Sequence, residues 1–308
     1  SSVRRNLCNY IVAGRDSWHW WRTCVPMSDG FRSFLGPSSG SKISTWATEV
    51  APRLLSAGGV VGSLIVKFTL PQVVKTSNGM MTGLSPAMWW RMCFRIIPKA
   101  GGFKTAQYSA MREMKLSLDG RGVCPPAIST MLSFGVMGTI FQSLVYNTLI
   151  KDMYHIYTGK SSPGRSKGIA PGLVWCFCRE SLAMGGGLVL GPVVRELMLS
   201  PQQEHGVDVA GKPLVRFLGG FISGACTALA TQWLHNAALM AGRLAAHGET
   251  QGAPLYTVAS LRTAYGELGV RIFYANYPLR MAHIAGTVAV LNTLDIFHQP
   301  ELIALKLL

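Results

Sequence analysis

Four basic residues lie within or beside apolar stretches long enough to be membrane helices. They are Arg95, Arg179, Arg280 and His283. A charge in the bilayer interior costs at least about 2.5 to 3.5 kcal/mol on insertion scales, so an intramembrane base predicts a functional site. Such side chains would bind anionic solutes or lipid headgroups. The alternative is that each is paired with a backbone carbonyl, with Glu180 or with a lipid phosphate.

No pattern typical of an enzyme or a metal site accompanies these bases. The seven cysteines include no C-x-x-C, and the closest two, Cys176 and Cys178, fall on different faces of a helix. The seven histidines form no H-E-x-x-H motif, and no Ser-His-Asp or Cys-His arrangement can be assembled. We therefore expect no catalysis, no metal and no cofactor, although a phospholipid such as cardiolipin could bind.

The composition indicates a membrane protein. Hydrophobic residues make up 49% of the 308 residues and charged residues only 14%, whereas about a quarter of an ordinary globular chain is charged. The 29 Lys and Arg residues against 14 Asp and Glu give a net charge of +15, which favours anionic lipids, anionic solutes or an acidic partner. The 34 glycines and the long uncharged runs argue against nucleic-acid binding.

Six segments are candidates for transmembrane helices. Two are uncharged over a length that can cross a bilayer, Ala127 to Ile150 and Phe217 to Gly242. Four more contain or adjoin charged residues: Leu54 to Val74, Trp89 to Tyr108, Gly172 to Val194 and Met281 to Leu294. Glycine spacing, as in Gly220-x-x-x-Gly224 and the pair Gly135 and Gly138, predicts close helix crossings.

The segments alternate between Gly-bearing and base-bearing helices, which predicts a threefold internal repeat. Residues 79–100 and 269–286 have a similar layout, in which Arg95-x-x-Pro98 aligns with His283-x-x-Gly286. Each odd helix ends in a short polar turn, as in Leu70-Pro-Gln-Val-Val-Lys75.

In these features the chain resembles the mitochondrial carrier family over roughly residues 50 to 300. That family has odd helices ending in P-x-[DE]-x-x-[KR] and even helices ending in [FY]-[DE]-x-x-[RK]. The resemblance implies an all-α membrane protein with six transmembrane helices in three two-helix repeats, at 51–115, 116–200 and 201–308. It also places Arg95, Arg179, Arg280 and His283 on or near cavity positions of the even helices.

In the family, acids and bases of these motifs form two rings of ion pairs that close opposite mouths of the bundle. The matrix-side positions read Gln72, Lys75, Thr148, Lys151 and His235, with Leu234 as the alternative to His235. The opposite positions read Arg112, Arg195, Asp295 and His298. Since one carboxylate faces two arginines and a histidine, at most one ion pair can form, which argues against ordinary transport.

Residues 1–50 form a basic, Trp-rich extension that we interpret as a docking segment at the headgroups, with a presequence remnant as the alternative. The sequence thus predicts a multi-pass protein of the mitochondrial inner membrane, surrounded by lipid and bound to other subunits. We expect a non-transporting accessory subunit of a respiratory complex or the ATP synthase.

The alternative is a divergent carrier that exchanges an anionic metabolite, with Arg95, Arg179 and Arg280 as its binding site. This alternative would be favoured if carboxylates bridged the lysines and arginines around an open chamber. The candidates are Asp152, Glu196 and Glu113.

Overall fold

The computed structural model describes residues 46–72, 85–142, 147–159, 172–199, 213–246 and 258–297. The chain divides into two compact units, Ser1–Ala51 and Pro52–Leu308. The described part of the first unit contains the π-helical turn η1 (Trp46–Val50). The rest of the predicted docking extension lies outside the described residues.

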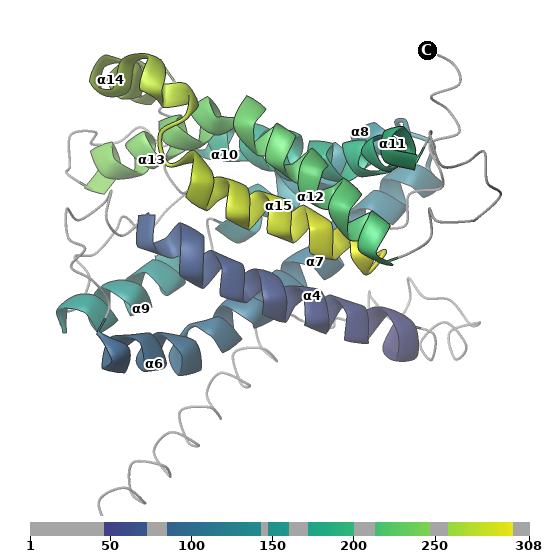
Figure 1. Ribbon diagram of the computed structural model, residues 1–308, viewed down its shortest axis with the longest axis horizontal. Coiled ribbons are helices and arrows are strands. Elements are labelled where there is room, and N and C mark those ends of the chain that lie inside the picture. Colours follow the sequence, from purple (N-terminus) through teal and green to yellow (C-terminus); the bar gives the residue numbers. More distant parts are fainter. Residues whose placement is uncertain are drawn as a thin grey trace, which may run out of the picture. The chain divides into compact units, whose positions relative to one another are not determined.

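From Ala51 onward every described element is helical, and these ranges contain no strand (Figure 1). The elements are α4 (Ala51–Leu64), η2 (Ile65–Thr69), α6 (Pro86–Arg95), α7 (Ile97–Gly120), α8 (Pro126–Phe141), α9 (Asn147–Thr158), α10 (Leu173–Arg179), η4 (Glu180–Gly185), α11 (Gly186–Leu199), α12 (Pro213–Ala230), α13 (Gln232–Ala246), α14 (Val258–Leu268), η6 (Gly269–Phe273) and α15 (Tyr277–Thr293).

Three helices in the described ranges are long and apolar enough to cross a membrane. They are Trp46–Gln72, Leu173–Leu199 and Pro213–Ala230. All three contain charged residues, yet they are long enough to cross, whereas the uncharged stretch at 127–150 is not, because its described helix α8 is only 16 residues long. The chain is therefore an all-helical protein with three apolar helices compatible with a membrane protein.

The predicted span from Phe217 to Gly242 is not one continuous helix, because a turn at Thr231 separates α12 from α13. The break has a physical cause in a side chain from α15. The Arg280 guanidinium donates a 2.5 Å hydrogen bond to the carbonyl of Ala228, one turn before the start of α13. The Thr231 hydroxyl donates to the Thr227 carbonyl at 2.6 Å, a local bond that competes with regular helix geometry.

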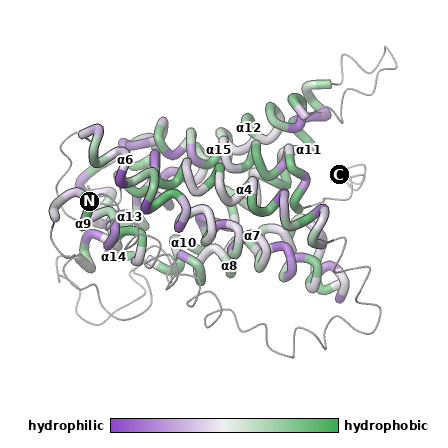
Figure 2. Tube along the Cα trace, turned by 90° about the horizontal axis from the view of Figure 1, so that it is seen from below, coloured by the Kyte–Doolittle hydropathy of each residue, from purple (hydrophilic) through white to green (hydrophobic). Residues whose placement is uncertain are grey.

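The helices of the second unit pack in a closed cycle. Along the chain, η2 packs against α7, α7 against α8, α8 against α10 and η4, α11 against α12, and α12 against α15. The cycle closes where α15 packs against η2. In Figures 1 and 2, α6, α9, α13 and α14 gather at one end of this bundle.

Small residues allow the backbones to cross closely, as the glycine spacing predicts. A Cβ on Gly62 would lie 2.5 Å from the backbone nitrogen of Gly101. A Cβ on Gly220 would lie 2.9 Å from the Cα of Ala289. Because hydrophobic attraction between helices is absent in lipid, such contacts are a main source of helix association there. The predicted close crossings are confirmed.

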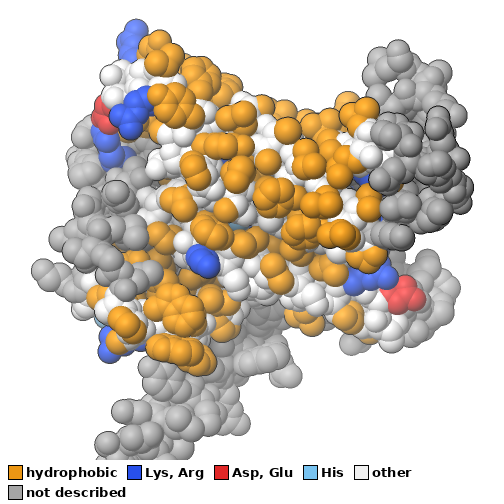
Figure 3. Space-filling view, in the orientation of Figure 1, with side chains coloured by type: hydrophobic (Ala, Val, Ile, Leu, Met, Phe, Trp, Pro, Cys, Tyr) orange, Lys and Arg blue, Asp and Glu red, His pale blue; other side chains and the backbone are white. Residues whose placement is uncertain are grey.

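Large apolar side chains remain exposed on the outside of the bundle. They include Leu55, Val60, Ile128, Ile140, Leu182, Leu190, Ile222 and Leu229. Figure 3 shows hydrophobic side chains over most of one face, with charged groups mainly toward its edges. A soluble monomer rarely exposes so large a contiguous apolar surface, and lipid is the environment in which this exposure carries no cost.

At the end that carries α14, an apolar cluster joins α13, α14 and η6. It consists of Met240, Leu244, Ala264 and Ile272. Arg243 of α13 pairs with Glu267 of α14 through two hydrogen bonds, one of 2.8 Å. Hence α14 is held to α13 by both packing and charge.

Candidate functional site

A cavity inside the helix cycle is lined by residues of η2, α7, α8, α10, η4 and α15, together with residues of α9 and α13. Its apolar wall includes Ile65, Ala100, Phe103, Phe141, Leu149 and Ile284. Its polar wall includes Gln72, Lys104, Gln107, Gln142, Arg179, Glu180, His235, Arg280 and His283. The two sets face one space, so a ligand in it would meet both charged groups and hydrocarbon.

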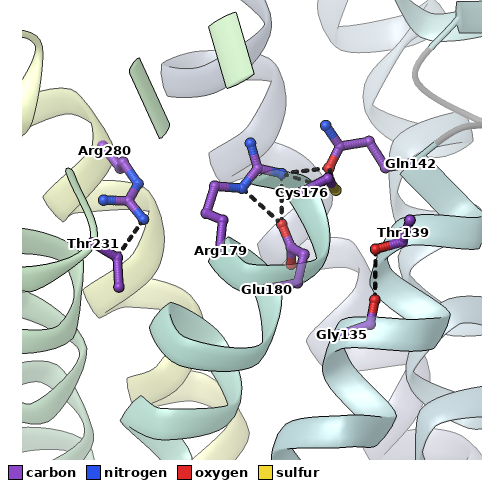
Figure 4. Close-up of polar contacts among 8 residues, drawn as sticks. All are labelled: Gly135, Thr139, Gln142, Cys176, Arg179, Glu180, Thr231 and Arg280. Carbon is purple, nitrogen blue, oxygen red and sulfur yellow. Dashed lines mark hydrogen bonds and ion pairs between the residues drawn. The ribbon is translucent and has the colours of Figure 1, made fainter. Parts of the chain in front are cut away.

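Arg179 and Glu180 form a buried ion pair at the junction of α10 and η4 (Figure 4). Nη2 of Arg179 lies 2.7 Å from Oε1 of Glu180, and Nε donates to the same oxygen at 3.2 Å. Nη2 also donates to Oε1 of Gln142 at the end of α8. The Cys176 thiol donates to that amide oxygen at 2.7 Å. The arginine is thereby fixed in position by partners from two helices.

Arg280 projects from α15 into the turn between α12 and α13. Besides the Ala228 carbonyl, its guanidinium donates to the Thr231 hydroxyl at 2.7 Å and to the Gln232 side-chain oxygen at 3.1 Å. Its Nε has no hydrogen-bond partner in the described part of the chain. All three acceptors are neutral, so the positive charge is solvated but not neutralised.

Lys104 supplies a third cation from α7. Its Nζ lies 5.7 Å from the centre of the Tyr108 ring, a cation–π distance. Within the described ranges no carboxylate lies at ion-pair distance from this nitrogen. Lys104, Arg179 and Arg280 thus share the cavity with a single carboxylate, Glu180.

Neutral donors complete the polar wall. Nε2 of His283 and Nε2 of Gln72 are buried, and neither has a hydrogen-bond partner within the described residues. A buried polar nitrogen without a partner is costly, and both atoms belong to residues that line the cavity. The site as a whole can hold an anion by charge and by hydrogen bonds.

One contact beside the cavity joins Gln72, at the end of the helix Trp46–Gln72, to His235 of α13. Nε2 of His235 lies 3.4 Å from Oε1 of Gln72. Both belong to the predicted matrix-side gate positions. The other described members of that set, Thr148 and Lys151, are exposed on α9, while Lys75 lies outside the described residues.

The described residues of the opposite gate set form no ion pair with one another. Arg112 pairs with its neighbour Glu113 at 3.2 Å. Asp295 instead lies 3.7 Å from Arg216 of α12. Nε of Arg195 finds no partner in the described ranges, and His298 lies outside them.

Of the four predicted anion-binding residues, the structure brings three together. Arg179, Arg280 and His283 line the cavity. Arg95 is half-exposed on α6, 4.0 Å from Asp152 of α9, and does not line it. A kink explains this position, because Ile96 separates α6 from α7 and Pro98 lies in the first turn of the new helix.

Sequence reasoning noted Asp152 but did not find its partner. Its carboxylate lies 2.7 Å from Nζ of Lys99 and ties the start of α7 to α9. Of the other two carboxylates considered from sequence, Glu113 pairs only with the adjacent Arg112, and Glu196 forms no ion pair in the described ranges. The ion pairs between helices therefore lie outside the cavity wall.

Lys104 and Gln142 were also missed as site residues. The available signal was weak: Lys104 is one of four bases between Trp89 and Tyr108, and its inward position depends on the kink at Ile96 and on the packing of α7. Gln142 is one polar residue at the end of an uncharged stretch.

The cavity, its three cations and its neutral donors are properties of this chain's own geometry. Comparison of the chain with protein-family models, with curated proteins and with solved structures gives no match.

Proposed function

We propose that the chain is a multi-pass membrane protein of mitochondrial carrier type whose central cavity binds an anionic metabolite. In this proposal six helical segments, in three two-helix repeats, cross the mitochondrial inner membrane. The observation that carries it is the excess of cations in the cavity, where Lys104, Arg179 and Arg280 meet only Glu180.

Two further features support this function. The helices close into a cycle, so the cavity is surrounded by protein rather than open to lipid. A cationic group in a low-dielectric interior attracts an anion far more strongly than it would in water. The unpartnered donors of His283 and Gln72 add hydrogen bonds that orient the ligand.

The test is binding and exchange by the purified full chain. Anions are added to the detergent-solubilised protein at constant ionic strength, and the apparent melting temperature is measured; liposomes loaded with the same anion then report exchange. We expect an anion-dependent stabilisation that Lys104→Met weakens about tenfold in apparent affinity, because a cavity charge is removed.

Lys67→Met is the matched control. Lys67 is exposed on η2 and does not line the cavity, so the same substitution there leaves binding unchanged. If both variants respond to anions as the unmodified protein does, or if no anion stabilises the protein, the proposal is wrong.

A second candidate is a non-transporting accessory subunit of an inner-membrane complex, such as a respiratory complex or the ATP synthase. The specific observation in its favour is the neutral contact between His235 and Gln72, where alternating access would need a breakable ion pair. The exposed, stacked rings of Trp90 and Phe94 on α6 offer a docking surface for another subunit.

Native electrophoresis of the endogenous protein in mild detergent separates the two functions. Comigration with a high-mass assembly, together with no exchange in liposomes, would favour the accessory subunit. A monomer with saturable exchange would favour the anion carrier.

A further inference from the structure

We infer that the cavity selects a small organic dianion with two separated carboxylates; this inference rests on the proposed anion-binding function. The observation is the charge of the cavity wall. Lys104, Arg179 and Arg280 contribute three positive charges and Glu180 one negative charge, which leaves two positive charges. A buried ligand is bound best when its charge balances the site, because an excess of either sign remains desolvated and unpaired.

The residual charges belong to two particular side chains. Arg179 is held by Glu180 at 2.7 Å and by Gln142, so its charge is already balanced. Arg280 and Lys104 have no carboxylate at ion-pair distance within the described ranges. They project from different helices, α15 and α7, and both line the same cavity.

The remaining wall favours a carbon skeleton between the two ends. Phe103, Phe141 and Ile284 present hydrocarbon to the same space. An inorganic dianion such as sulfate would leave this surface without a partner, whereas the methylene groups of a dicarboxylate would be buried against it. The unpartnered Nε2 atoms of Gln72 and His283 can donate to further carboxylate oxygens.

The experiment uses the full chain in detergent and compares acetate, succinate, tricarballylate and sulfate at equal ionic strength. Apparent affinities come from the shift in melting temperature with anion concentration. We expect succinate to bind at least about tenfold more tightly than acetate, because the second carboxylate meets a second uncompensated cation. We also expect sulfate to bind more weakly than succinate.

Two variants change the charge of the wall in opposite directions. Glu180→Gln keeps an amide oxygen for Arg179 and raises the residual charge of the cavity by one. The ratio of the tricarballylate affinity to the succinate affinity should therefore rise about tenfold. Lys104→Met lowers the charge by one and should remove the preference of succinate over acetate. Lys67→Met, outside the cavity, should leave the order unchanged.

Each result decides the inference. Three results would overturn the dianion inference while leaving anion binding in place. They are equal affinity for acetate and succinate, tighter binding of sulfate than of succinate, or an order of affinities that neither cavity variant alters. An absence of stabilisation by all four anions would overturn both the inference and the proposed function.

Discussion

Two buried charges in this protein, those of Lys115 and Arg179, are balanced by carboxylates close by in the chain. Lys115 of α7 is only 3% exposed, and its Nζ lies 2.5 Å from Oδ2 of Asp119, one helical turn away. The Ser129 hydroxyl of α8 donates to the other oxygen of Asp119. One carboxylate therefore neutralises a buried lysine and connects two helices.

Removing that carboxylate should leave a buried charge unpaired. We expect Asp119→Ala to lower the free energy of unfolding by about 3 kcal/mol, the lower end for broken buried pairs, since Asp119 keeps partial exposure. Thermal unfolding in detergent measures the effect. The double variant Lys115→Met with Asp119→Leu, which removes both charges, should recover most of the loss; failure to recover would contradict the charge explanation.

The exposed pair at the far end of the bundle should respond to pH. Hydrogen bonds donated by Arg243 hold the pKa of Glu267 below its ordinary value of 4.5. A lowered pKa in the folded state means that the pair stabilises the protein above pH 4.5 and that this contribution is lost as the pH falls through the lowered pKa.

Because Glu267 is largely exposed, the effect is small. Glu267→Gln should lower the free energy of unfolding by about 0.5 kcal/mol at pH 7, and the difference from the unmodified protein should shrink as the pH falls through the lowered pKa of Glu267. Unfolding curves at several pH values test this. A difference that grows at acidic pH would reverse the expected sign.

At the scale of helices, the crossing of α4 and α7 depends on the absence of side chains. Besides the 2.5 Å approach to the Gly101 nitrogen, a Cβ on Gly62 would lie 2.7 Å from the Gly101 Cα, so only a backbone shift could accommodate it. A Cβ on the nearby Gly59 would meet nothing within 4 Å. These two positions differ in packing but not in residue type or helix.

We therefore expect Gly62→Ala to destabilise the protein by about 1 to 3 kcal/mol, as overpacking does. Gly59→Ala should be neutral or slightly stabilising, because alanine is the better helix former by about 1 kcal/mol. Melting temperatures of the two variants in the same detergent give the comparison. Equal destabilisation by both would show that the crossing is not tightly packed.

The helices and their close crossings could be predicted from sequence because apolar length and glycine spacing are local signals. The break between α12 and α13 could not, since it depends on Arg280 reaching the Ala228 carbonyl 52 residues away. The same limit applies to the cavity. Arg179 and Arg280 were found as bases within apolar stretches, but the inward position of Lys104 depends on the kink at Ile96 and on the packing of α7.

For the whole molecule, the number of membrane crossings is the quantity to measure. If only the three candidate helices cross, positions 77 and 123 lie on the same side, because no candidate helix separates them. If six segments cross, α6 and α7 place them on opposite sides. We expect Ser77→Cys and Val123→Cys, each in a cysteine-free background, to be labelled by an impermeant maleimide from opposite sides. Labelling from one side would contradict six crossings.

The packing of α15 against η2 has a consequence for how the protein is made. Of the described helices, α15 is the last along the chain and closes the cycle, so the earlier helices must form without it. They can do so because their charges find partners early: Glu180 follows Arg179 directly, and Asp119 follows Lys115 by four residues. Arg280 emerges after its acceptors on α12 and α13. The cycle therefore closes only after its other helices are made, and truncation before residue 277 would leave it open where α15 packs against η2.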